Sequence, residues 1–377
     1  MVEIRASTSA DVSLSPLESL QAGHWFKLIC GASYQSLPAV RNLTLAYALA
    51  GADCIDVAAD LAVVAAAKEG LLAAQRLVRH APGWQKETYQ TSAWQRNSRW
   101  RRPWLMVSMS AGADPHFRKA WFDAEKCPSD CSRPCEDVCP AMAIDGTGVI
   151  RDRCYGCGRC LPVCPLGLIE ARSQPTTLDA IAQSVLSQVD ALEIHTHVGN
   201  EAAFKQLWQT ITPWISHLKL ISISCPDGEN FIAYLQSLQR IMGWIEPTVR
   251  LHKPQPVLVW QTDGRPMSGD IGKGTTHAAV RLAQKVIASE IPGYVQLAGG
   301  TNEYTVLKLR EMGLLQCSNE GSMRPRAVSG IAYGSFARRL LMPVIDQTHY
   351  LEEVPKALHR AVSLAESLVA PLKPLVK

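Results

Sequence analysis

The residues most able to carry chemistry are cysteines, and eight of the twelve in this 377-residue chain lie between residues 127 and 164. The last four are Cys154, Cys157, Cys160 and Cys164, separated by two, two and three residues and followed by a proline. This is the spacing of bacterial ferredoxins, whose thiolates bind the irons of an iron–sulfur cluster. The stretch therefore predicts iron–sulfur chemistry.

The first four cysteines of the stretch are spaced more widely, with three residues between each and the next. In two-cluster ferredoxin modules the fourth cysteine of each run binds the other cluster. We therefore assign to one cluster Cys154, Cys157, Cys160 and Cys139, and to the other Cys127, Cys131, Cys135 and Cys164. Two four-iron (4Fe–4S) clusters are expected, and the wider spacing leaves a three-iron form open for the cluster on the first run.

A pair of structural zinc sites is the alternative interpretation. Zinc prefers two Cys-x2-Cys pairs or a mixture of cysteine and histidine, and no histidine lies between Cys127 and Cys164. Gly156 and Gly158 would also let the backbone approach inorganic sulfides closely enough for its N–H groups to bond them. These features favour iron–sulfur over zinc.

Composition places the chain among ordinary globular proteins. Apolar residues make up 47% and charged residues 19%, which is enough for a sizeable core, and the net charge of +4 is small for this length. This balance does not favour nucleic acid or a membrane surface as the main partner. We find no secretory signal and no apolar run of roughly 20 residues. Because such thiolates need a reducing compartment, we expect a cytoplasmic protein.

Eight short apolar, β-rich runs alternate along the chain with helical patterns or with space for a helix. The runs are Trp25–Cys30, Cys54–Ala58, Trp104–Met109, Ala191–His195, Leu218–Ser224, Val257–Gln261, Tyr294–Ala298 and Val328–Ala332. Alternation of this kind indicates parallel strands with right-handed crossovers, and eight of them predict an α/β fold, a closed (β/α)8 TIM-like barrel. A doubly wound open sheet is the alternative.

These runs divide the chain into four parts. A flexible lead occupies residues 1–20, the barrel 21–126 and 173–345, a ferredoxin-like insert 127–172, and a C-terminal helix and tail 346–377. The insert follows the third strand, so we expect it on the face of the barrel where the strands end, since ligands bind there.

The loops after the seventh and eighth strands contain the residues Gly299, Gly300, Thr301, Asn302, Gly334 and Ser335. Barrels commonly bind phosphate at this position, through free N–H groups at helix N-termini, so a flavin such as FMN or a sugar phosphate could lie there. The alternative is that these are glycine turns whose hydroxyl and amide side chains cap helices.

The loop after the sixth strand is long, glycine-rich and charged, with Asp263, Arg265 and Lys273 as its candidate functional residues. It does not match a nucleotide P-loop, because Gly274 follows Lys273 where a hydroxyl is required. We interpret it as a clamp over the barrel mouth or, equally, as solvated surface.

Three stretches together resemble a known family. Residues 26–35 (FKLICGASYQ), residues 54–60 (CIDVAAD) and the paired cysteine runs resemble the LdpA family, the light-dependent-period proteins of cyanobacteria. The resemblance extends from about Leu20 to Ile345. It implies an iron–sulfur redox sensor that informs the circadian clock of light, in association with clock proteins such as KaiA, CikA and SasA.

Two functional hypotheses follow. The first is a sensor without catalysis, in which electrons from the quinone or ferredoxin pool change the charge of one cluster and thereby a partner surface. The second is a ferredoxin-coupled, flavin-dependent oxidoreductase, in which electron transfer from the clusters reaches a flavin in the barrel.

Overall fold

Eight parallel strands close into a barrel in the order β1-β12-β11-β10-β9-β8-β3-β2, so the predicted (β/α)8 fold is confirmed and the open sheet is wrong. The computed structural model describes residues 14–80, 100–112, 118–139, 141–154, 156, 158–173, 184–244, 255–264, 274–315, 327–346 and 348–374. The eight runs expected to be strands are strands, and their ends shift by at most two residues. The strands are β1 Trp25–Ile29, β2 Cys54–Ala58, β3 Trp104–Ser110, β8 Ala191–His195, β9 Leu220–Pro226, β10 Val257–Asp263, β11 Tyr294–Ala298 and β12 Gly330–Tyr333.

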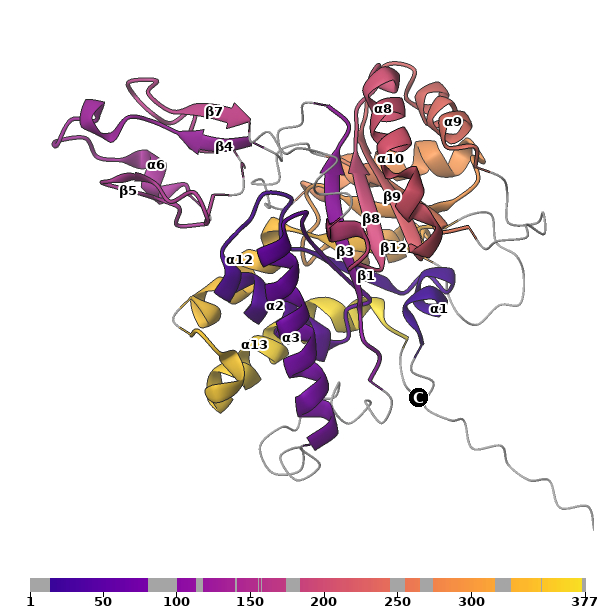
Figure 1. Cartoon of the computed structure of the whole chain (residues 1–377), viewed down its shortest axis with the longest axis horizontal. Coiled ribbons are helices and arrows are strands. Elements are labelled where there is room, and N and C mark those ends of the chain that lie inside the picture. The colour runs from indigo at the N-terminus through magenta and orange to yellow at the C-terminus, as the bar shows by residue number, and fades with distance from the viewer. Residues whose placement is uncertain are drawn as a thin grey trace, which may run out of the picture.

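Helices surround this barrel (Figure 1). They are α2 Leu37–Ala50, α3 Leu61–His80, α8 Glu201–Ile211, α9 Phe231–Met242, α10 Thr276–Ala288, α11 Thr305–Glu311, α12 Ser335–Ile345 and α13 Pro355–Val369, with 3-10 turns at Thr212–His217, Leu351–Glu353 and Ala370–Leu372. Local signals set their ends: Asp60 accepts hydrogen bonds from the first N–H groups of α3, and Gly51 ends α2 in the left-handed conformation at a φ of 94°. The predicted C-terminal helix is α13, which packs on α2 and α12.

A helix that was not predicted from the sequence packs at the end of the barrel where the strands begin. Helix α1, Pro16–Gln21, starts in a capping box between Ser15 and Glu18, and its Leu20 is buried with Trp25 and Trp104. The predicted flexible lead of residues 1–20 is therefore wrong from residue 14 onward. The capping signal is local, but a six-residue helix is too short to show a period.

Charged side chains fill the middle of the barrel, where such folds usually have branched apolar residues. Lys27, Glu193 and Asp56 are 0%, 0% and 1% exposed. The Lys27 ammonium donates to Glu193 and lies 3.5 Å from Asp56 Oδ2. Ser108 Oγ donates to Asp56 at 2.8 Å, so the network continues onto β3.

The pKa values of these groups reflect competition between burial and charge. Burial alone would lower the pKa of Lys27, but the carboxylates of Glu193 and Asp56 outweigh it and raise the value. Burial alone would raise the pKa of Glu193, whereas Lys27 and His195 hold it below its ordinary range. Burial raises the pKa of Asp56 to about 6, partly offset by Lys27. The network therefore carries charge at neutral pH.

The inserted unit projects from one side of the barrel (Figure 1). Its elements are β4 Arg118–Trp121, the 3-10 turn Ala124–Lys126, α6 Pro134–Asp137, β5 Ile144–Asp145, β6 Gly148–Val149 and β7 Glu170–Ser173. Strands β4 and β7 pair antiparallel and close the unit at its base. Since β4 belongs to this pair, the unit begins at Arg118, ahead of the boundary predicted at residue 127.

The unit touches the barrel at the rim of the face where the strands end. Lys119 Nζ on β4 donates to Gln35 Oε1 at 2.8 Å, and the Gln35 N–H donates to Asp152 O at 3.0 Å. Gln35 lies in the segment between β1 and α2, and Arg153 lies 3.7 Å from Asp346 after α12. The contacts of Gln35, which follows β1, place this part of the unit at the edge of the predicted face.

Replacing Lys27 with Met is expected to lower the free energy of unfolding by about 3–5 kcal/mol, because Glu193 keeps a buried charge without its partner. The matched control is Lys285→Met, whose ion pair with Asp227 is about half exposed and is expected to contribute less than about 1 kcal/mol. Urea unfolding of both variants measures this. Equal losses of unfolding free energy in the two variants would contradict the prediction for the buried Lys27–Glu193 pair.

Replacing Asp56 with Asn is expected to change how stability depends on pH. The pKa of Asp56 is about 6 in the folded protein, above that of an Asp in the unfolded chain, so the folded protein binds this proton more tightly. The wild type therefore loses stability as pH rises from the pKa of the unfolded chain towards 6. The amide cannot ionise, so the free energy of unfolding of Asp56→Asn should gain about 2–3 kcal/mol over the wild type across that window. The free energy of unfolding of both proteins is measured at several pH values. A difference between the two proteins that stays constant across these pH values would contradict the prediction.

Candidate functional site

The first group of thiols contains the three leading cysteines of the run together with the last cysteine of the second run. The Cys127 thiol is hydrogen-bonded to that of Cys131, and partial burial raises its pKa, as do the charges of Cys131 and Cys164. Burial also raises the pKa of Cys135, and Cys164 acts on it in the same direction. Cys164 is therefore near enough to Cys127 and Cys135 for its charge to act on both thiols, although 29 positions separate it from Cys135 in the sequence.

Backbone groups hold this first set in place. Cys135 is carried by the short helix α6, which starts at Pro134 after Arg133 in a left-handed conformation, with a φ of 50°. The Cys164 sulfur accepts a hydrogen bond from the Leu168 N–H at 3.4 Å. Burial would raise the pKa of Cys164, but this bond and neighbouring N–H groups outweigh it and lower the value. The environment of Cys164 thus favours the thiolate, the form that binds iron.

The second group of thiols surrounds a cavity of about 180 Å³ inside the unit. Cys139, Cys154 and Cys160 line it, and so do Gly156 and Gly158 at φ values of 72° and 74°, which favour glycine. Two of these sulfurs accept main-chain hydrogen bonds: Cys139 from Ala143 at 3.2 Å and Cys154 from Ala120 at 3.4 Å. Cys157 lies outside the described residues.

The chemistry of this donor set fits iron–sulfur clusters. None of the ten cysteines among the described residues is in a disulfide, so their thiols are available as ligands. Eight thiolates in two runs match the ligand number of two cubane clusters, in which each thiolate binds a different iron. Main-chain N–H groups directed at sulfur are also the interactions that tune such clusters.

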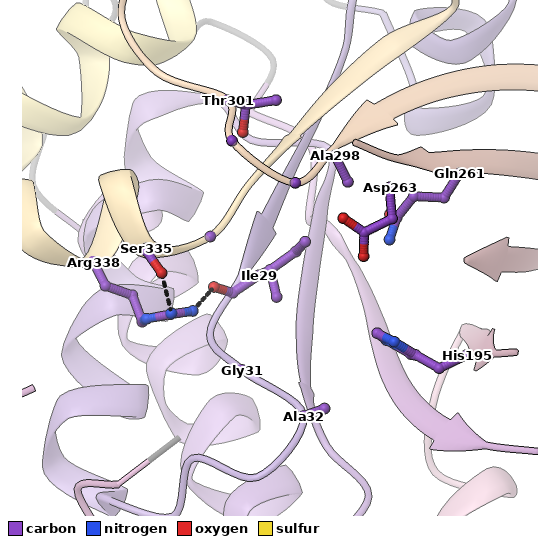
Figure 2. Close-up of a pocket in the computed structure, with 13 residues that line it drawn as sticks. Ile29, Gly31, Ala32, His195, Gln261, Asp263, Ala298, Thr301, Ser335 and Arg338 are labelled. Atoms are coloured by element: carbon purple, nitrogen blue, oxygen red, sulfur yellow. Dashed lines mark hydrogen bonds between the residues drawn. The ribbon is translucent and has the colours of Figure 1, made fainter. Parts of the chain in front are cut away.

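A second pocket lies at the mouth of the barrel and has a volume of about 50 Å³ (Figure 2). Of the predicted residues, those that line it are Gly299, Gly300, Thr301, Gly334, Ser335 and Asp263. Asn302 does not line it: its side chain accepts from the Tyr304 N–H at 3.0 Å and stabilises the start of α11, as the capping alternative proposed. Arg265 and Lys273 lie outside the described residues.

A flavin does not fit this pocket. Sites for cofactors and drug-sized ligands have volumes of about 300–1,000 Å³, and the pocket bounded by these residues has about 50 Å³. The predicted loops therefore come together as expected, but the space between them suits a much smaller group than FMN.

The charged network beneath this pocket was not predicted from the sequence. Glu193 Oε1 lies 3.1 Å from Nε2 of His195, and His195 lines the pocket, so the network reaches the pocket wall. His195, held in this way, can donate or accept a proton there. A signal was present: Lys27, Asp56 and Glu193 each stand at the centre of a five-residue strand whose neighbouring residues are apolar.

Comparison with known proteins identifies the family. Residues 127–175 match the family described as the LdpA Fe-S cluster-binding domain, and residues 185–371 match the Light dependent period A C-terminal domain. The chain is 53% identical over 366 residues to the Light dependent period A protein of Synechococcus elongatus. The aligned region covers 96% of this chain and 94% of that protein.

Among solved structures, a tryptophan synthase of Mycobacterium tuberculosis aligns with a TM-score of 0.41 and 11% identity, over 95% of this chain and 96% of its own. The barrel assignment itself comes from the strand order. The match over nearly the whole length of the Synechococcus protein, with both family domains in sequence order, shows that this chain belongs to the Light dependent period A family.

Proposed function

We propose that this protein is an iron–sulfur redox sensor that conveys the light-dependent redox state of the cell to a circadian clock. The observation that carries the proposal is the separation of the thiols into two groups within the inserted unit. Two four-iron clusters would be held by Cys127, Cys131, Cys135 and Cys164, and by Cys139, Cys154, Cys157 and Cys160. The name of the Synechococcus relative, Light dependent period A, supports the link to a light-dependent period.

The unit is joined to the barrel in a way that suits a sensor. A bound cluster supplies one-electron chemistry and changes the local charge by one unit. The Ala120 N–H donates to the Cys154 sulfur, and the neighbouring Lys119, 3% exposed, donates to Gln35 and to Arg151 O. Because charges act strongly in a buried setting, a change at Cys154 reaches the segment before α2 through two adjacent residues of β4.

The proposal extends to partners and location. We infer that electrons come from the quinone or ferredoxin pool, and that the changed surface is recognised by clock proteins such as KaiA, CikA or SasA. Within the described residues no helix is long and apolar enough to cross a membrane. We place the protein in the cytoplasm, where its free thiols stay reduced.

Replacing Cys154 with Ser is expected to remove one cluster. Protein purified without oxygen should lose about half of its iron and sulfide relative to the wild type, since each cluster needs its own four thiolates. Cys225→Ser is the matched control, a buried free thiol on β9 far in sequence from the unit, and should keep all of its iron. Colourless wild-type protein, or protein that contains zinc, would overturn the proposal.

Replacing Cys160 with Ser in the living cell is expected to abolish the dependence of the clock period on light intensity, because the sensing cluster loses a ligand. The period is measured by a rhythmic reporter at low and high light, with Cys225→Ser as control. A Cys160→Ser strain whose period still responds to light would show that the clusters do not carry the signal, even if they bind iron.

A further inference from the structure

The pocket at the barrel mouth has no role in the redox proposal, and its residues point to a ligand. We propose that it binds a small organic phosphate with a hydroxyl group, with the phosphate against the loops after β11 and β12 and the hydroxyl against Asp263 and His195. The inference is independent of the iron–sulfur function, because the residues that line this pocket and those that line the cysteine cavity are different.

Buried charge is the first observation. Asp263, His195 and Arg338 all line the pocket and are 6%, 7% and 4% exposed. Ionisable side chains are costly to bury, and hydrophobic substitutes of the same volume are often as stable. Their convergence on one cavity, at the end of the barrel where ligands bind, indicates a binding site.

One side of the pocket is suited to an anion. Arg338 donates to the main-chain oxygens of Ile29 and Cys30 at 2.8 and 3.1 Å, and to Ser335 Oγ at 3.0 Å. The guanidinium therefore lies beside the first turn of the eleven-residue helix α12, which starts at Ser335, and its positive charge is close to the positive end of that helix.

Glycines leave part of this side of the pocket without side chains. Gly300 has a φ of 90°, and a Cβ atom there would lie 2.7 Å from Thr275 O, so packing against the segment before α10 requires glycine at this position. At Gly299, Gly300 and Gly334 the pocket is therefore lined by main chain, which can approach a phosphate directly.

The opposite side is suited to a hydroxyl group. Figure 2 shows Asp263, Gln261 and His195 facing Thr301, Ser335 and Arg338 across the pocket. The Asp263 carboxylate would repel a phosphate but accepts a hydrogen bond from a hydroxyl. The two sides together select a molecule with an anionic end and a hydroxyl end.

The size of the pocket limits the ligand further. A volume of about 50 Å³ corresponds to about three to five water positions, at about 10–15 Å³ each. This suits a tetrahedral phosphate with a short carbon chain and excludes nucleotides and ring cofactors.

The test uses the iron-loaded full chain, purified without oxygen, and measures binding of inorganic phosphate and of glycerol 3-phosphate by calorimetry. The wild type should bind glycerol 3-phosphate more tightly than phosphate. Ser335→Asp places a carboxylate at the first position of α12, where it favours the helix but repels phosphate, and should weaken both ligands about tenfold or more. Lys356→Asp, in the first turn of α13 and outside the pocket, is the control and should bind like the wild type.

A second variant tests the other end. Asp263→Asn removes the repulsive charge and should tighten inorganic phosphate about threefold, which narrows the preference for glycerol 3-phosphate. No binding of either probe, equal binding of the two by the wild type, or unchanged binding by Ser335→Asp would each overturn the proposal. Iron content and the visible spectrum, measured on every sample, report the clusters separately, so failure here leaves the redox proposal intact.

Discussion

The hydrogen-bonded closure of the barrel is the constraint on which the rest of the molecule depends. Strand β1 pairs with β2 on one side and with β12 on the other, so the first and last strands of the chain meet in one circuit. Since the strands are all parallel, every segment that follows a strand emerges at the same end. That geometry brings the insert after β3, the glycines after β11 and the start of α12 to one face, although up to about 220 residues separate them in the sequence. At the other end, α1 covers an apolar layer that contains Trp25 and Trp104.

The middle layer of the barrel has a polarity that stability alone does not explain. A buried Lys27–Glu193 pair contributes less than well-packed apolar side chains of the same volume often would, and it is costly if either partner is lost. Ser222 Oγ and Gln261 Nε2 donate to Glu193 at 2.9 and 2.8 Å, so the carboxylate is fully engaged by β1, β9 and β10 at once. This arrangement ties β1, β8, β9 and β10 together, and it holds the ring of His195 at the wall of the pocket. The charges therefore connect the middle of the barrel to the pocket above it.

The sequence predicted what depends on neighbours in the chain and missed what depends on distant partners. Runs of β-branched and apolar residues identified all eight strands, since each strand is buried and bounded by turn residues. The cysteine spacings were enough to predict that the last thiol of each run binds the cluster of the other run, because this rule depends only on spacing within the inserted unit. Lys27 and Glu193, by contrast, are 166 residues apart, and the local sequence around either residue does not indicate the other as its partner. Strand β4 was missed for the same reason: its four residues are defined by pairing with β7, on the far side of the insert. Cys157, Arg265 and Lys273 lie outside the described residues and remain predictions.

One segment of backbone touches both sites. Between β1 and α2, Gly31 and Ala32 line the barrel pocket, and Gln35 a few residues later bonds to Lys119 and Asp152 of the inserted unit. The left-handed φ of 124° at Gly31 sets the direction in which this segment leaves the barrel. If a change of charge at Cys154 shifts the segment, the shape of the pocket changes with it. Coupling of this kind is reciprocal. If reduction of a cluster changes the affinity of the pocket for a ligand, binding of that ligand changes the reduction potential of the cluster, and the two effects have the same free energy. Under the two proposals made above, the barrel would combine a ligand signal with an electronic one, which a small electron carrier without the barrel could not do.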